Sequence, residues 1–168
     1  KNLQLTLGDA PRVAKTVNPE AHRLVLEGRY FLNQRNDEAF ARAEVAFKRA
    51  LEIDPEFAEA HAGLAAVLGV RGWYRLMAGN RASAEADFAR AKEEVRRAQA
   101  LNPELAEPSA ILGLVLMNEL NFNESERQFT QALALNPNDA SVRHFYSNLL
   151  GSQGRLDEAV KEIERSLS

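Results

Sequence analysis

The sequence contains no cysteine and only three histidines. Without thiols, disulfide bonds, thiolate metal sites and cysteine nucleophiles are excluded, and the lack fits the cytoplasmic location that we expect. His22, His61 and His144 lie far apart, with no second ligand at metal-binding spacing. No glycine-rich phosphate-binding loop is present. We therefore expect neither a metal ion nor a cofactor.

Long apolar runs and an excess of positive charge are also missing. No run approaches the roughly 18 apolar residues of a membrane span, and no signal-peptide pattern is present. Lys and Arg number 21 against 24 Asp and Glu, and the two signs are interspersed along the chain to a net charge of −3. Such a surface has no electrostatic footprint for nucleic acid. We expect neither nucleic acid nor a membrane as partner.

Catalytic signatures are absent as well. The sequence has no nucleophile elbow and no kinase motif. Its acidic pairs, such as Glu93-Glu94 and Asp157-Glu158, lie among Lys and Arg on predicted helices, as solvated helix faces do. A general acid and base need a pocket that holds both groups, and this pattern indicates none. We therefore expect a protein that is not an enzyme.

What is present is a periodic pattern of apolar and small residues. The 168 residues are 45% hydrophobic and 27% charged, a balance typical of a globular fold. Pro103 and Pro137 are 34 residues apart. Between them, apolar residues recur at helical intervals on both sides of a break at 119–123, which predicts two amphipathic helices. Small residues at Gly113 and Ser125 would let the two helices pack closely.

The same unit recurs imperfectly along the chain. We predict repeats at about 19–55, 56–103, 104–137 and 138–168, preceded by a connector at 1–18. Asn18 and Pro19 are suited to cap and begin the first helix. The first repeat carries about three extra residues around 33–38. The second spans 48 residues from Pro55 to Pro103, and we place its surplus near RGWYRLMAGNRASAE, in a long connection and in a second helix extended back to about Arg81.

The pattern in 104–137, with its 34-residue interval and its register of Leu112-Gly113, Leu116, Ser125, Phe129 and Ala132, resembles the tetratricopeptide repeat (TPR). The resemblance covers about 19–168. It implies an all-α fold, a right-handed superhelical solenoid of antiparallel helix pairs. The sequence departs from the family at the tryptophan often found early in the first helix. Those positions hold Leu24, His61, Ser109 and Arg143.

A narrower resemblance concerns the first two repeats. NPEAHRLVLEGRYFLNQRN followed by AFKRALEIDPEFAEAHAGLAAVLG is similar to the C-terminal TPR region of bacterial multidomain signalling proteins. In those proteins the repeats follow a winged-helix DNA-binding domain, a nucleotide cyclase domain or a protein kinase domain. The sequence opens on Lys1 without methionine, and we expect it to be a segment of a longer protein.

The resemblance implies a concave groove, lined by the first helix of each pair, that binds a peptide or a partner helix. The inward positions of the four repeats are Val25, Arg29 and Leu32; Ala62, Ala66 and Gly69; Ala110, Leu114 and Met117; and His144, Asn148 and Gly151. Some of them would instead complete the packing between repeats. We expect Arg29 and Arg71 to serve as polar anchors. Trp73, Tyr74 and Met77 would form a secondary contact, or else pack back on the lengthened helix.

The composition of these positions narrows the class of partner. TPR proteins that clamp acidic chaperone tails place Lys and Asn at the fifth and ninth positions of the first repeat, which point inward. Here these positions hold Val25 and Arg29. We therefore expect an apolar or amphipathic protein segment, and not an acidic chaperone tail.

Two other functions stay open. The chain could be a homo-oligomerisation module, acting through the insertion around Trp73 or through the fourth repeat, whose sequence ends before a closing helix. It could also be the non-catalytic fragment of a nucleotide cyclase, kinase or transcriptional regulator.

Overall fold

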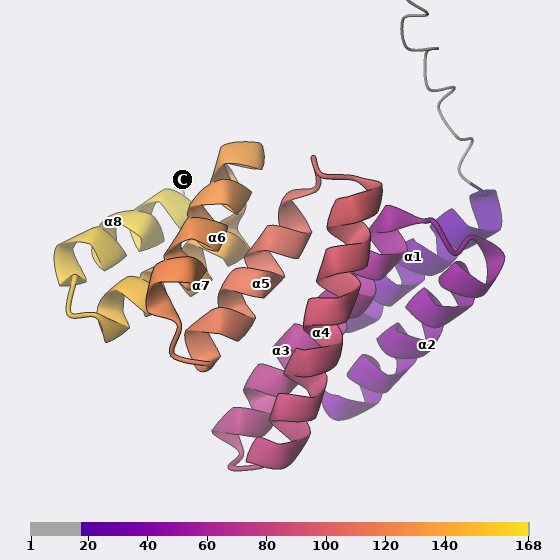
Figure 1. Cartoon of the computed structure of the whole chain (residues 1–168), viewed down its shortest axis with the longest axis horizontal. Helices are drawn as coiled ribbons and strands as arrows, with labels where there is room; N and C mark the ends of the chain where they lie inside the picture. Colours follow the sequence, from indigo (N-terminus) through magenta and orange to yellow (C-terminus); the bar gives the residue numbers. More distant parts are fainter. Residues whose placement is uncertain (1–17, 168) are drawn as a thin grey trace, which may run out of the picture.

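The chain folds into a row of antiparallel helix pairs (Figure 1). The structure is a computed structural model that describes residues 18–167. The eight helices in this range are α1 (Pro19–Leu32), α2 (Asp37–Ile53), α3 (Ala58–Met77), α4 (Arg81–Leu101), α5 (Ala106–Asn118), α6 (Phe122–Leu135), α7 (Ala140–Ser152) and α8 (Leu156–Ser166). Residues 1–17 of the predicted connector lie outside the described residues, and the four predicted repeats each correspond to one helix pair.

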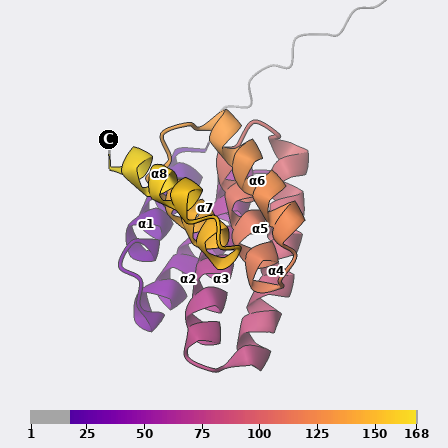
Figure 2. The same cartoon turned by 90° about the vertical axis from the view of Figure 1, so that its left-hand side faces the viewer.

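The pairs are stacked in chain order. Each helix pairs mainly with its hairpin partner, and α3, α5 and α7 also contact the first helix of the pair before. Figure 2 looks onto the C-terminal pair, with α7 and α8 in front of the rest. The described residues thus form an all-α solenoid of antiparallel helix pairs, as predicted.

The start of α1 follows from two residues. Asn18 is the N-cap, and its side-chain oxygen accepts hydrogen bonds from the backbone N–H groups of Glu20 at 2.9 Å and Ala21 at 3.3 Å. These donors have no partner inside the helix, so the cap satisfies them. Pro19 fits the first turn because its missing N–H is not needed there.

Within a hairpin, a small residue on one helix admits a large aromatic from the other. A Cβ added to Gly113 would lie 2.8 Å from the ring of Phe129, and one added to Gly28 would lie 2.7 Å from the ring of Phe47. The Ser125 hydroxyl, as predicted to face Gly113, donates to the Gly113 carbonyl at 2.7 Å. Both phenylalanines are fully buried, so these contacts form the centre of each pair.

The same aromatic also joins successive repeats. A Cβ added to Gly63 in α3 would lie 2.1 Å from Phe47 in α2. The Phe47 ring therefore fills the space between Gly28 of its own repeat and Gly63 of the next. Because glycine has no side chain, α2 and α3 can approach closely enough to enclose the ring on both sides.

The structure corrects one detail of the second repeat. The predicted long connection near Trp73 is helical, since α3 continues to Met77 and only Ala78–Asn80 separate it from α4. Gly72 lets Phe88 of α4 pack against it, with a Cβ at Gly72 only 2.6 Å from that ring, so the two helices lengthen together. The start of α4 at Arg81 agrees with the prediction.

The extra residues of the first repeat, predicted around 33–38, lie at the start of α2. The connection between α1 and α2 is short, at 33–36, and α2 begins at Asp37, six residues before the small residue Ala43. In the third repeat, α6 begins only three residues before the matching Ser125. The three additional residues therefore add a turn to the start of α2.

None of the helices within residues 18–167 combines the length and apolar character that a membrane crossing requires.

Candidate functional site

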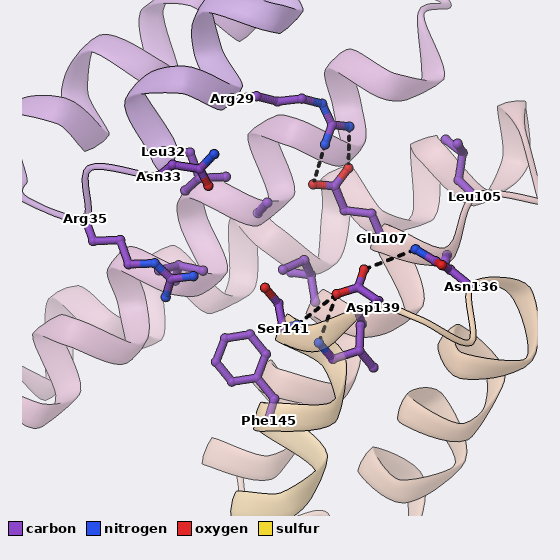
Figure 3. Close-up of a pocket in the computed structure, with 16 residues that line it drawn as sticks. Arg29, Leu32, Asn33, Arg35, Leu105, Glu107, Asn136, Asp139, Ser141 and Phe145 are labelled. Carbon is purple, nitrogen blue, oxygen red and sulfur yellow. Dashed lines mark hydrogen bonds and ion pairs between the residues drawn. The ribbon is translucent and has the colours of Figure 1, made fainter. Parts of the chain in front are cut away.

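A hollow opens on the concave side of the solenoid, where α1, α3, α5 and α7 lie side by side. It encloses about 430 Å³. The residues that line it come from these four helices and the loops beside them: Arg29, Leu32, Asn33, Arg35, Ala66, Val70, Leu105, Ala106, Glu107, Ala110, Ile111, Asn136, Asp139, Ser141, Val142 and Phe145 (Figure 3). We call this set the concave hollow.

The floor of the concave hollow is apolar and made of small or branched side chains. Ala66 and Val70 of α3, together with Ala110 and Ile111 of α5, line it and are almost completely buried. Because alanine has only a methyl group, Ala66 and Ala110 leave a recess in the wall that they line. The recess leaves room for side chains of a partner.

An ion pair spans the concave hollow above this floor. The Arg29 guanidinium of α1 donates two hydrogen bonds to the Glu107 carboxylate at the start of α5, at 2.6 and 3.4 Å (Figure 3). The two residues belong to the first and third repeats, so the pair crosses the second. Both side chains are partly exposed, and the charge of Arg29, predicted as an anchor for a partner, is thus balanced within the chain.

Arg35 is the cation of the concave hollow that stays available. Its side chain has no hydrogen bond or ion pair to any other residue that the structure describes, and it is exposed. Its backbone has a φ of 52°, in the left-handed region that non-glycine residues rarely adopt. Arg35 and Phe145 also line a smaller neighbouring hollow. A positive charge therefore lies beside an apolar recess.

The acidic residue at the opposite rim is already engaged. Asp139 caps α7, accepting hydrogen bonds from the backbone N–H groups of Ser141 at 3.0 Å and Val142 at 3.1 Å. The Asn136 side chain also donates to it at 3.5 Å. Its carboxylate satisfies the helix start, which positions Ser141 and Phe145 on the first turns of α7.

The structure brings some of the predicted groove residues together and separates others. Arg29, Leu32, Ala66 and Ala110 line the concave hollow. His144 lines the smaller neighbouring hollow, beside Arg35. Val25, Ala62, Gly69 and Leu114 are buried in the packing between helices, Met117 packs against the core, and Asn148 and Gly151 lie on α7 outside the lining of both hollows.

Arg71 was predicted to be a polar anchor in the groove, but it does not lie on the groove surface. It is buried, and its guanidinium donates two hydrogen bonds to Asp87 of α4, at 2.9 and 2.7 Å, and one to Glu44 of α2, at 2.7 Å. Burial opposes the ionisation of Glu44, yet hydrogen bonds from its cationic neighbours, Lys48, Arg90 and Arg71, outweigh it and lower the pKa of Glu44 to about 2. Arg71 therefore joins three helices from inside.

The residues of the predicted secondary contact lie on the last turns of α3. Trp73 packs against the core, its ring centroid 5.0 Å from that of Tyr74, and Tyr74 in turn lies 5.7 Å from Phe40 of α2. Met77 is exposed at the end of the helix. Trp73 thus packs against the core, while Tyr74 lies beside Phe40 of α2 and stays 37% exposed, so the secondary contact stays a prediction.

Sequence reasoning missed several residues that line the concave hollow. Arg35 follows the end of α1, Glu107 precedes the predicted Ala110 by three residues, and Ile111 follows it by one. Phe145 follows the predicted His144 directly. The sequence did contain a signal for Ile111 and Phe145. Both are large apolar residues at the repeat position where the second repeat has Gly63.

Among residues 18–167, no three His, Asp or Glu side chains gather closely enough to hold a metal ion.

Comparison with known proteins bears on the fold. No family model matches the sequence, and no curated protein matches it either. Solved structures do match. The first TPR domain of human RPAP3 aligns over 82% of this chain and 95% of its own, at 15% identity and a TM-score of 0.61. TTC0263, a TPR protein of Thermus thermophilus, aligns over 88% and 90%, at 21% identity and a TM-score of 0.51.

A third structure, MamA from Desulfovibrio magneticus, aligns over 88% of this chain and 73% of its own, at 17% identity and a TM-score of 0.57. Identities at this level show similarity of fold. The described residues therefore have the fold of TPR proteins, an all-α solenoid of stacked helix pairs.

Proposed function

We propose that this chain is a non-catalytic protein-interaction scaffold whose concave hollow binds an apolar or amphipathic protein segment. The single observation that carries the proposal is the recessed apolar floor of Ala66, Val70, Ala110 and Ile111 on the concave side. Small residues there leave space that a partner's side chains would fill. Apolar contact would supply the affinity, since the burial of each Leu-sized side chain contributes about 1.5–3 kcal/mol.

The polar groups around the floor specify the partner further. Arg29 and Glu107 satisfy one another, and Asp139 is held by the start of α7. Arg35 is left to attract a partner, so the segment that fits best has apolar side chains for the floor and a carboxylate for Arg35. A strongly acidic chaperone tail fits poorly, because one available cation beside an apolar recess is not a clamp for several carboxylates.

The wider setting is a proposal that rests on the sequence resemblance. We propose that the chain is a regulatory, partner-binding segment of a larger bacterial signalling protein that works in the cytoplasm. The similarity of the first two repeats to such C-terminal regions supports this setting. A covalently joined cyclase, kinase or DNA-binding domain would supply catalysis or DNA recognition, while the repeats would select its partner.

A titration followed by nuclear magnetic resonance tests the binding proposal. Three peptides of equal length are added to the isotopically labelled chain: an amphipathic helix with one acidic residue, its sequence-scrambled form and an acidic chaperone tail. We expect the amphipathic peptide to shift the backbone signals of Leu32, Ala66, Ala110 and Phe145. Micromolar binding of the acidic tail, or shifts confined to the convex helices, would refute the proposal.

Two variants make the test specific to the concave hollow. Ala110→Trp fills the recess and should abolish the shifts, because the indole would occupy the space of the partner's side chain. Ala134→Trp is the matched control, because Ala134 is exposed on α6 and is not among the residues that line the concave hollow. It should leave the affinity unchanged. Equal loss in both variants would contradict the assignment of the site.

A further inference from the structure

The two ends of the solenoid carry apolar side chains at positions that the inner repeats bury. In each repeat a small, buried residue of the first helix marks the register; these residues are Gly28, Ala65, Gly113 and Ser147. Two positions before it stand Leu26, Gly63, Ile111 and Phe145, and two positions after it stand Tyr30, Val67, Val115 and Leu149. All are buried in the second, third and fourth repeats. Leu26 and Tyr30 are 55% and 65% exposed.

In the inner repeats these positions pack on the repeat before. Gly63 faces Phe47 of α2, and Ile111 and Val115 lie 2.8 and 3.9 Å from a Cβ placed at Gly69 of α3. Leu26 and Tyr30 are thus the parts of α1 that a preceding repeat would cover. We call the exposed side of α1 and α2 that carries them the N-terminal edge.

The other end shows the matching feature. The small residues Ala43, Ala91, Ser125 and Ala159 mark the register of the second helices, and four positions later stand Phe47, Val95, Phe129 and Ile163. The first three are fully buried, whereas Ile163 is 44% exposed. With Leu156 and Val160 of α8, and with Leu167 directly after the helix, it forms an exposed apolar stripe, which we call the C-terminal edge.

One position on this stripe shows that α8 is suited for burial. This position directly follows the small register residue of each second helix. In the first three repeats it holds Glu44, Lys92 and Glu126. Each is ion-paired with the next repeat: Glu44 with Arg71 at 2.7 Å, Lys92 with Glu119 at 2.6 Å and Glu126 with Arg155 at 2.8 Å. In the last repeat it is Val160, 53% exposed. The outermost helix is therefore apolar where the inner ones are charged, the reverse of what a face kept in water favours.

Charged side chains beside the two edges can pair. Arg42 and Arg49 line a hollow of about 270 Å³ between α1 and α2 at the N-terminal edge, together with Glu27, which is ion-paired with Arg23. Asp157 and Glu164 flank the apolar stripe of α8. Arg42, Arg49, Asp157 and Glu164 have no hydrogen bond or ion pair to another side chain within the described part of the chain. The two cations of one copy and the two anions of the next would attract one another.

From this match of register and charge we propose that copies of the chain associate head to tail, with the C-terminal edge of one copy packed on the N-terminal edge of the next. Ile163 would meet Leu26 of the second copy as Phe47 meets Gly63 within one copy. Such a contact is heterologous, so it leaves a free edge at both ends and permits chains longer than two copies. It would also carry the concave surface on from copy to copy.

Sedimentation equilibrium of the full 168-residue chain at several concentrations tests the proposal. We expect the mean mass to rise with concentration beyond twice the 18.7 kDa of one copy, and to fall in high salt, which screens the charged edges. A wild-type chain that stays a monomer throughout would overturn the proposal, and so would a mass that stops at two copies. The edges would then be suited to a different segment.

Two variants separate head-to-tail association from symmetric pairing. Val160→Glu restores the charge of the first and third repeats and blocks the C-terminal edge. Leu26→Lys blocks the N-terminal edge. We expect each variant alone to be monomeric and an equimolar mixture to form a complex of two copies and no larger. Dimers of Leu26→Lys alone would show tail-to-tail pairing and refute the proposal, as dimers of Val160→Glu alone would for head-to-head pairing.

The matched control is Leu135→Glu, because Leu135 is a partly exposed apolar residue at the end of α6, on neither edge. Its mass should equal that of the wild type at every concentration. Far-ultraviolet circular dichroism should show the same helix content for all variants. If Leu135→Glu abolished association as fully as the edge variants, the proposed register would be wrong.

Discussion

Replacing Gly63 by alanine tests the contact on which the stacking of the first two repeats depends. The new Cβ would lie 2.1 Å from Cε1 and 2.4 Å from Cζ of Phe47, whose ring is fully buried between Gly63 and Gly28. The ring has no free side to move into, so the overpacking cost falls near the upper end of its range, about 3 kcal/mol. Alanine's better helix propensity returns about 1 kcal/mol. We expect Gly63→Ala to lose about 2 kcal/mol of stability.

Gly151→Ala is the matched control. Gly151 also lies in a helix, but a Cβ added there meets nothing within 4 Å. The substitution should therefore stabilise the chain by about 0.5–1 kcal/mol. The assay is urea unfolding followed by far-ultraviolet circular dichroism. Equal effects of the two substitutions would refute the reasoning, because they would show that Phe47 does not pack on Gly63.

A second substitution tests whether Phe47 causes the loss of stability expected for Gly63→Ala. Phe47→Leu shortens the side chain that Gly63→Ala would strike. In that background Gly63→Ala should cost at least about 1 kcal/mol less than in the wild type, since residues in contact have non-additive effects. Additive effects would place the cost of Gly63→Ala elsewhere.

Three further predictions concern polar and strained residues. Arg71→Met should destabilise the chain by about 2–3 kcal/mol in urea unfolding, because it removes two hydrogen bonds from the buried Asp87 carboxylate and leaves it the ion pair with Arg75; a loss below about 1 kcal/mol would contradict this. Leu120→Gly should stabilise the chain by about 1 kcal/mol, measured by the same unfolding, because Leu120 has a φ of 63° and is exposed; unchanged stability would argue against strain there. His61→Gln should remove a pH-dependent part of the stability, measured by unfolding across the pH range. Burial opposes the charged imidazole, but hydrogen bonds to Glu94 and to the Pro55 carbonyl outweigh it and raise the pKa of His61. The contribution is therefore full below the unfolded pKa of about 6.5 and lost as the pH rises through the higher folded pKa; identical pH profiles for variant and wild type would contradict it.

Local signals in the sequence were enough to predict most of the fold. Asn18 and Pro19 start α1 as their capping chemistry requires, and the start of α4 at Arg81 follows from the Gly79-Asn80 turn. The small residues Gly113 and Ser125 face one another as their spacing predicts. These features depend on neighbours within one helix pair, so the residue pattern contains them.

The continuation of α3 could not be predicted in the same way. The segment with Gly69, Gly72 and Trp73 predicts a connection between helices, because glycine is a poor helix former and three polar or aromatic residues follow Gly72. In the structure Gly72 leaves room for the ring of Phe88, a residue of α4 that lies sixteen positions later in the chain. Tertiary contact overrides local propensity at this point.

The candidate site was predicted only in part, for a geometric reason. Register places a Cα on the inner face of a helix, and it did so for Ala66 and Ala110. It does not say where a long side chain ends. Arg29 reaches across the second repeat to Glu107. Arg71 stands half a turn around α3 from the inward residue Ala62, so register itself places it away from the inner face, and it binds carboxylates of α2 and α4. Arg35 belongs to a loop, to which helical register does not apply.

The central claim is that the first helices of successive pairs form one concave wall, so that Arg29 and Glu107, from different repeats, face one another across it. Because the sequence has no cysteine, the double variant Arg29→Cys/Glu107→Cys can be cross-linked specifically with a short bis-maleimide. We expect rapid intramolecular cross-linking of this pair and none for Arg29→Cys/Arg96→Cys, whose second cysteine lies on α4. Slow or absent cross-linking between 29 and 107, or equal reaction of both pairs, would contradict it.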